Sequence, residues 1–259
     1  MLLAFDVGNT NTVFGIYEKN KLLDYWRIST IKGKTEDELI VLIKQLLNMK
    51  GYELESINRV IISSVVPQVM YSLEHMADKY CGVKAMIVGP GIKSGINIKY
   101  DNPKEVGADR IVNSVGALKK YGKGLIIVDF GTATTFDVVS DKGAYLGGAI
   151  LPGIKISQDA LFRKAAKLTR VELVKPKKVI AKNTVESIQS GIIYGYAGSV
   201  KNIVEQMKKE LPYDVKVIAT GGLANLIGEV AESIDVIDKF LTLDGLKFIH
   251  DLNRWLVWK

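Results

Sequence analysis

The chain has 259 residues, of which 47% are hydrophobic and 24% are charged, and 35 basic against 28 acidic residues give a net charge of +7. This balance is typical of a soluble globular protein with one large domain or two small ones. No apolar run reaches the ~18–20 residues of a membrane span, and the single cysteine excludes an internal disulfide and a Cys-ligated zinc site. The first residues lack a signal-peptide pattern, so we expect a cytoplasmic protein.

The positive charge is spread along the chain. Lys119-Lys120, Lys177-Lys178 and Lys208-Lys209 are far apart and have no interleaved aromatic residues. A positive net charge suits a partner with several negative charges, such as a nucleoside triphosphate or a nucleic acid. Because the lysines are scattered, a solvated surface is the better interpretation, and we expect neither a nucleic-acid nor a membrane partner.

The first half begins with short apolar runs separated by turn residues. Leu2–Val7 and Thr12–Tyr17 flank Gly8-Asn9-Thr10-Asn11, which predicts two strands joined by a polar turn. A capping box from Thr35 to Glu38 predicts the start of a helix that ends at Gly51. The other elements expected in this half are strands over Leu22–Ile28, Arg59–Val66 and Lys84–Val88, a helix from Pro67 to about Tyr80, and a helix that begins near Asp109 and includes Ile111, Val112, Val115 and Leu118.

The second half repeats this opening. The apolar run Leu125–Asp129 ends in a carboxylate, and the pattern Asp-x-Gly-x-x-x-Thr occurs in both Asp6–Thr12 and Asp129–Thr135. Because both turns stand between strands, the repeat predicts two related α/β halves. We place them at 1–120 and 121–259 and expect them to face each other across a cleft. The second half is expected to contain strands over Phe136–Ser140, Tyr145–Leu151 and Asp214–Ala219, and helices after Asn183 and over Leu223–Glu232.

Both repeated turns carry groups that can bind a polyphosphate. Gly8 lets the backbone approach a ligand, and the hydroxyls and amides of Thr10–Thr12 can donate to phosphate oxygens. Asp6 is placed to hold Mg²⁺ through water. A plain hairpin turn is the alternative for one such turn alone. Asp129 at the end of a second buried strand favours phosphate binding, because a carboxylate there needs a cation or hydrogen bonds.

Two common nucleotide-binding motifs are absent. The sequence contains no Gly-x-x-x-x-Gly-Lys-Ser/Thr, and the absence of Gly-x-Gly-x-x-Gly argues against a dinucleotide-binding dehydrogenase. Thr220-Gly221-Gly222 instead follows a predicted strand and precedes a helix, where bare backbone can lie against a base or ribose.

Two further segments suggest chemistry or packing. Asp109 and Arg110 stand near the start of a helix, where the Asp can accept a proton from an attacking hydroxyl and the Arg can bind a carboxylate. A surface cap with a salt bridge is the alternative for this pair. In the helix after Asn183, Gly191, Gly195 and Gly198 share one face, which predicts close packing against the same chain or a second subunit.

Six motifs together resemble the type III pantothenate kinase family, in that family's order and over nearly the whole chain. They are Asp6-Val7-Gly8-Asn9-Thr10, Ser63-Ser64-Val65-Val66-Pro67, Gly107-Ala108-Asp109-Arg110, Asp129-Phe130-Gly131-Thr132-Ala133-Thr134-Thr135, Gly147-Gly148-Ala149-Ile150-Leu151-Pro152-Gly153 and Ala219-Thr220-Gly221-Gly222.

The resemblance implies a homodimer of duplicated actin-like, hexokinase-like (ribonuclease H-like) halves. It implies ATP-dependent phosphorylation of pantothenate to 4'-phosphopantothenate, the first step of coenzyme A biosynthesis. Asp109 would be the general base, Asp6 would serve Mg²⁺, and Asp129 would hold a monovalent cation, K⁺ or NH₄⁺. The implied ATP-binding residues are Asp6, Val7, Gly8, Asn9, Thr10, Asn11, Thr12, Val13, Thr132, Gly221 and Gly222. The implied pantothenate-binding residues are Tyr100, Gly107, Ala108, Asp109, Arg110 and, across the dimer interface, Thr184.

Two other functions stay open at this point. Actin-like folds support many phosphoryl transfers, so another kinase or a polyphosphate-cleaving hydrolase is one alternative. An accessory factor in transcription is the second, which the positive charge permits. The scattering of that charge and the set of Asp6, Asp109 and Asp129 argue against it.

Overall fold

A computed structural model describes residues 1–165, 168 and 170–254, and the chain divides into two compact units. Unit 1 contains Met1–Ile96, Asp101–Lys119 and the C-terminal segment from Leu241, and unit 2 contains Asn97–Tyr100 and Lys120–Phe240. These units differ from the predicted halves 1–120 and 121–259. The C-terminal segment belongs to unit 1. A four-residue excursion of the first half, Asn97–Tyr100, belongs to unit 2.

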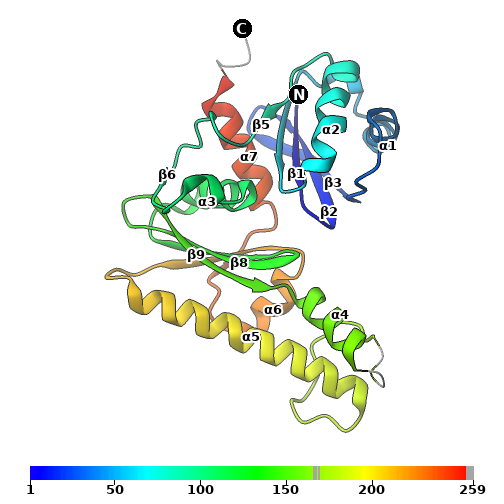
Figure 1. Cartoon of the computed structure of the whole chain (residues 1–259). Coiled ribbons are helices and arrows are strands. Elements are labelled where there is room, and N and C mark those ends of the chain that lie inside the picture. The colour runs from blue at the N-terminus through cyan, green and yellow to red at the C-terminus, as the bar shows by residue number, and fades with distance from the viewer. Residues whose placement is uncertain (166–167, 169, 255–259) are drawn as a thin grey trace. The chain divides into compact units, whose positions relative to one another are not determined.

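Unit 1 is built on a five-stranded sheet in the order β3-β2-β1-β4-β5 (Figure 1). Strand β1 pairs antiparallel with β2 and parallel with β4. Leu3, Phe5 and Val7 alternate along β1 and join the hydrophobic core that α1 and α2 cover. The elements are β1 (Leu2–Val7), β2 (Asn11–Glu18), β3 (Lys21–Ser29), α1 (Glu36–Asn48), a 3₁₀ turn (Leu54–Ser56), β4 (Arg59–Ser64), α2 (Pro67–Cys81) and β5 (Met86–Ile87).

Local signals placed the start of α1 correctly. The Thr35 hydroxyl accepts from the Glu38 amide at 3.3 Å, and the Glu38 carboxylate accepts from the Thr35 amide at 2.9 Å, which confirms the predicted capping box. The helix ends at Asn48, before Gly51, which has a φ of +78°.

Unit 2 contains a six-stranded sheet in the order β11-β10-β7-β8-β9-β6. Its β9-β8-β7-β10-β11 portion repeats the order of the first sheet, with β6 added at one edge. Helices α5 and α6 pack on the face that carries Ile126, Val128 and Phe130. The elements are β6 (Asn97–Ile98), β7 (Leu125–Phe130), β8 (Ala133–Val139), β9 (Ala144–Pro152), α4 (Ile154–Lys164), α5 (Thr184–Glu210), β10 (Lys216–Gly221), α6 (Ala224–Ala231) and β11 (Val236–Ile237). The predicted duplication is therefore confirmed in the strand order.

A 3₁₀ turn over Pro103–Glu105 precedes α3 (Ala108–Tyr121). Within unit 1, α3 packs backbone to backbone against α7 (Leu241–Leu252). A Cβ atom on Gly116 would lie 2.6 Å from the Leu241 carbonyl oxygen, and one on Gly245 would lie 2.1 Å from the Val112 carbonyl oxygen. Helix α7 also packs on β1 and β2, where Tyr17 donates its hydroxyl to Asp244 at 2.8 Å. This packing explains why the C-terminal segment belongs to unit 1.

None of the helices in the described part of the chain combines the length and the apolar character that a membrane span requires.

Candidate active site

The first repeated turn joins β1 to β2 and is closed by its own backbone. The Gly8 amide donates to the Asn11 carbonyl oxygen at 3.0 Å. Asn9 and Thr10 are exposed at the tip, and Asp6 is partly buried at the end of β1. A carboxylate and two exposed polar residues thus lie at one tight turn, an arrangement that can bind phosphate and a hydrated cation.

Thr30, just after β3, braces this turn and was missed by the sequence analysis. Its hydroxyl donates to the Gly8 carbonyl oxygen at 2.8 Å, and its amide donates to the Thr10 carbonyl oxygen at 3.1 Å. The hydroxyls of Thr12 and Thr30 are 2.9 Å apart. Because the Thr30 proton goes to Gly8, Thr12 is the donor in this pair. The Thr12 hydroxyl proton is therefore engaged inside the turn. No local signal marks Thr30, since its partners lie on the neighbouring hairpin.

The second turn joins β7 to β8 and is one residue shorter than the first. Four residues separate the ladder partners Val7 and Thr12, whereas three residues separate Phe130 and Thr134. The structural counterpart of Thr12 is therefore Thr134, although the Asp-x-Gly-x-x-x-Thr pattern aligns Thr12 with Thr135 in the sequence.

The two corresponding threonines are both buried and both hydrogen-bonded. The Thr134 side chain is 1% exposed and lies 2.6 Å from the hydroxyl of Tyr196 on α5. That hydroxyl is also 2.9 Å from the Pro152 carbonyl oxygen, to which it donates. Tyr196 thus has the place in unit 2 that Thr30 has in unit 1: each braces the threonine that closes a turn. Burial raises the pKa of Tyr196, which keeps its hydroxyl protonated as a donor.

Two glycines enclose the second turn. A Cβ atom on Gly153 would lie 2.1 Å from the Thr132 carbonyl oxygen, so only glycine fits beside the turn backbone. Gly221 has a φ of +93°, and its Cβ would lie 2.5 Å from the Asp129 carboxylate. The structure therefore brings the motif predicted for adenosine next to the aspartate predicted for a cation. Thr132 and Gly222 are exposed.

The ladder neighbours of the two aspartates also correspond. Asp6 pairs with Ser63 in β4, and Asp129 pairs with Thr220 in β10. The Ser63 hydroxyl is fully buried and has no hydrogen-bond partner among the described protein groups. Parallel ladder partners point to the same face of a sheet, so this hydroxyl and the Asp6 carboxylate share one face. Oxygen donors of this kind suit a hard cation that keeps water.

No group of three or more His, Cys, Asp or Glu side chains converges in the part of the chain that the structure covers. A cation at Asp6 or Asp129 would thus have at most two such side chains, together with hydroxyl, backbone or water oxygens. So few charged ligands fit hydrated ions such as Mg²⁺ and monovalent cations better than a caged transition metal.

Asp109 stands in the first turn of α3, as predicted. Its Oδ1 accepts from the Arg110 amide at 2.8 Å. A Cβ atom on Gly107 would lie 2.6 Å from the same oxygen, so a larger residue there would displace the Asp109 carboxylate. Burial raises the pKa of Asp109 above its ordinary value of 3.8, against the opposing effects of the Arg110 amide and guanidinium. The result is a carboxylate that is more basic than usual.

The residues predicted for pantothenate are divided between the units. Gly107–Arg110 belong to unit 1, and Tyr100 and Thr184 belong to unit 2. The Tyr100 ring packs over Gly147 and beside Tyr145. Thr184 is the first residue of α5 and is exposed.

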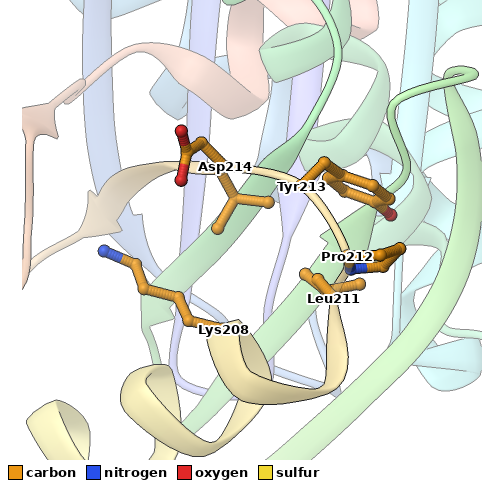
Figure 2. A pocket seen from close by; sticks show the side chains of 6 residues that line it. Lys208, Leu211, Pro212, Tyr213 and Asp214 are labelled. Atoms are coloured by element: carbon orange, nitrogen blue, oxygen red, sulfur yellow. The ribbon is translucent and has the colours of Figure 1, made fainter.

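A pocket of about 370 Å³ opens elsewhere in unit 2 (Figure 2). It is formed by the end of α5 and the segment leading to β10, and it contains none of the predicted site residues. Its lining residues are Lys208, Leu211, Pro212, Tyr213, Asp214 and Val215.

A family model agrees with the motifs found in the two turns and in α3. The model of type III pantothenate kinase matches residues 2–206, a range that includes Asp6, Asp109 and Asp129. The chain belongs to the type III pantothenate kinase family. It is accordingly a pantothenate kinase, an enzyme of coenzyme A biosynthesis that uses ATP. Gly221 and Gly222 lie beyond the matched range.

Solved structures place this pantothenate kinase in the actin-like, hexokinase-like fold. A Campylobacter jejuni protein, assigned by its name to a Baf family of transcriptional activators, is 21% identical, with a TM-score of 0.59 over 97% of this chain and 98% of that chain. Component A of (R)-2-hydroxyglutaryl-CoA dehydratase from Acidaminococcus fermentans is 14% identical, with a TM-score of 0.57 over 95% and 94%. ROK hexokinase from Thermus thermophilus is 14% identical, with a TM-score of 0.52 over 98% and 99%. At these identities the likeness confirms the predicted fold class alone.

Proposed function

We propose that this enzyme transfers the γ-phosphoryl group of ATP to the hydroxyl of pantothenate, giving 4'-phosphopantothenate, with Asp109 as the general base. The geometry of Asp109 carries this proposal. A partly buried carboxylate with a raised pKa, fixed by the Arg110 amide and by the space at Gly107, is suited to accept a proton from an alcohol.

The ATP phosphates are proposed to bind to both repeated turns. Asn9 and Thr10 in the first turn and Thr132 in the second are exposed, and their residue types carry the amide and hydroxyl groups that bind phosphate oxygens. The hydroxyl of Thr12 is not, because it donates to Thr30; any contact from Thr12 to ATP would come from its backbone. Gly221 and Gly222 are proposed to lie against the adenosine.

Asp6 is proposed to hold Mg²⁺ through water, and Asp129 is proposed to hold a monovalent cation. Bound Mg²⁺ would neutralise phosphate charge during transfer. The protein itself takes little covalent part: its turn amides orient the phosphates, and Asp109 orients and deprotonates the attacking alcohol. The side chain of Arg110 is proposed to bind the carboxylate of pantothenate, since a guanidinium can donate two parallel hydrogen bonds to it.

A homodimer built on α5 is proposed to complete the pantothenate site. Cβ atoms on Gly191, Gly195 and Gly198 would meet nothing within 4 Å in the described chain, apart from the backbone of their own helix, and all three glycines are exposed. A small-residue face with no neighbour in its own chain supports packing against a second copy. Thr184, at the start of the same helix, would then reach the partner's pantothenate. We also propose a cytoplasmic location, where both substrates are present.

The test is ATP-dependent phosphorylation across a small panel of acceptors: pantothenate, sugars, acetate and polyphosphate. ADP release and the mass of the product are both measured, with Asp109→Asn as the matched control. We expect the wild type to phosphorylate pantothenate and no other acceptor, and the variant to do so at least about a hundredfold more slowly. Phosphorylation of another acceptor without pantothenate, or ATP hydrolysis with no acceptor, would refute the proposal.

A further inference from the structure

Asp137 is a fully buried carboxylate in β8 to which the proposed mechanism assigns no role. Its Oδ1 accepts from the Tyr145 hydroxyl at 2.8 Å, and its Oδ2 accepts from the Thr135 hydroxyl at 3.1 Å. A buried carboxylate costs free energy unless both of its oxygens are satisfied. A hydrophobic side chain at position 137 would avoid this free-energy cost. An aspartate here instead fixes the arrangement of the two hydroxyls that donate to it.

Tyr145 connects this carboxylate to the excursion Asn97–Tyr100. The Tyr145 side chain is fully buried, and its carbonyl oxygen accepts from the Lys99 amide at 2.8 Å. Its ring centroid lies 6.2 Å from that of Tyr100, with an interplanar angle of 49°. Tyr145 therefore holds the excursion both by its backbone and by its ring.

A β-bulge in β9 shapes the surface on which the Tyr100 ring lies. Tyr145 pairs with Val139 and Gly147 pairs with Val138, so Leu146 is the extra residue. Gly147 has a φ of +112°, and its Cβ would lie 3.2 Å and 3.3 Å from two atoms of the Tyr100 ring. The bulge thus turns the Tyr145 side chain toward Asp137 while bare backbone accepts Tyr100.

We propose that Asp137 is a positioning residue for pantothenate, which acts through the hydroxyl of Tyr145 to fix the ring of Tyr100. This inference rests on the proposed function, in which Tyr100 binds pantothenate. The Asp137 carboxyl group accepts from two hydroxyls at once, so it sets the direction of the Tyr145 hydroxyl and with it the orientation of that ring. Tyr100 itself is only partly buried, so its ring depends on these neighbours for a single orientation.

The first test removes only the hydroxyl, with Tyr145→Phe. Tyr17→Phe is its matched control, because Tyr17 is also fully buried and also donates to an aspartate at 2.8 Å, in unit 1. Pantothenate affinity is measured by titration calorimetry, KM is measured for each substrate, and thermal unfolding is followed for all variants.

We expect Tyr145→Phe to raise the Kd and KM for pantothenate about fivefold, with the KM for ATP within about twofold of wild type. The control should lower Tm while leaving the Kd unchanged. Asp137→Asn, which keeps one acceptor oxygen, should have an intermediate effect. If Tyr145→Phe changes only Tm, as the control does, the role of Asp137 is structural and the inference is wrong.

A double-mutant cycle separates this inference from the proposed function. Tyr100→Ala should raise the Kd for pantothenate, and adding Tyr145→Phe to that variant should change it no further. If Tyr145→Phe has the same effect on the Kd with and without the Tyr100 ring, Tyr145 does not act through Tyr100. The inference is then wrong, while the role of Tyr100 in the proposed function stands. An unchanged Kd in Tyr100→Ala overturns the role of Tyr100 in the proposed function, and the inference with it.

Discussion

The hydroxyl of Thr30 donates a 2.8 Å hydrogen bond to the carbonyl oxygen of Gly8. Thr30 lies beyond the end of β3, so a residue far from the first turn in sequence sets the shape of that turn. Thr12 donates to the same hydroxyl, and the backbone of Thr30 holds Thr10. Three contacts from one residue thus hold the backbone that we propose to bind the phosphates of ATP.

Thr30→Val should raise the KM for ATP about fivefold or more, and leave the KM for pantothenate nearly unchanged. Valine has a similar shape but leaves the Thr12 hydroxyl and the Gly8 carbonyl without their partner, a loss of roughly 1–3 kcal/mol. Thr30→Ser, which keeps the hydroxyl, is the control. Equal KM values for ATP in the two variants would show that the hydrogen bonds do not shape the ATP site.

Asp109→Asn should reduce kcat at least about a hundredfold, as expected for the loss of a general base, while ATP still binds. The kcat/KM of the wild type should decline as the pH falls through the raised pKa of Asp109. Steady-state kinetics across pH test both expectations. Turnover close to that of the wild type would remove Asp109 from its role.

The same substitution should not destabilise the protein at pH 7. The pKa of Asp109 is higher in the folded state than in the unfolded state, so above that pKa its ionised form lowers the free energy of unfolding. Asparagine removes the charge and still accepts from the Arg110 amide. Urea denaturation of both proteins should give a variant at least as stable as the wild type, and a marked loss of stability would contradict the buried position of the carboxylate.

Asp129→Ala should weaken ATP binding and abolish the response of the enzyme to potassium. The variant removes the carboxylate beside Gly221 and keeps the glycines that enclose the second turn. The measurement is the rate as a function of KCl at constant ionic strength. A normal potassium response in this variant would show that the cation assignment is wrong.

Acidification should destabilise unit 1 through His250. Burial lowers the pKa of this histidine below 6.5, and Arg59 and Lys247 act in the same direction, against the opposing effect of Asp251. The unfolded state then binds the proton more tightly, so stability is lost as the pH falls from 6.5 toward the lowered pKa. Unfolding free energies measured between pH 5 and 8 should fall less steeply in His250→Gln. Parallel curves for the two proteins would exclude His250 as a source of the loss.

Gly195→Leu should convert a dimer into folded monomers. The position faces open space in its own chain, so the helix tolerates a side chain there, but a second copy packed on the glycine face would be displaced. Light scattering gives the mass, and circular dichroism checks the fold. Gln45→Leu, at an exposed position of α1 in unit 1, is the comparison for nonspecific effects of an added leucine. An unchanged dimer in Gly195→Leu would place the interface elsewhere.

Local patterns in the sequence were sufficient for the repeat, the strands that flank the turns and the helix cap at Thr35, and they gave the positions of Asp6 and Asp129 near strand ends and of Asp109 at a helix start. Each depends on neighbours within a few residues: Asp6 and Asp129 end apolar runs, and Thr35 and Glu38 cap one helix. The tertiary structure alone decided that Thr134 corresponds to Thr12, that α7 packs in unit 1, that Thr30 and Tyr196 brace the two turns, and that Gly221 lies against the Asp129 carboxylate. Those relationships depend on strand register and on contacts between residues far apart in the chain. The period of a sequence pattern specifies which face of a strand or helix a residue occupies, but it does not specify which partner the residue meets there.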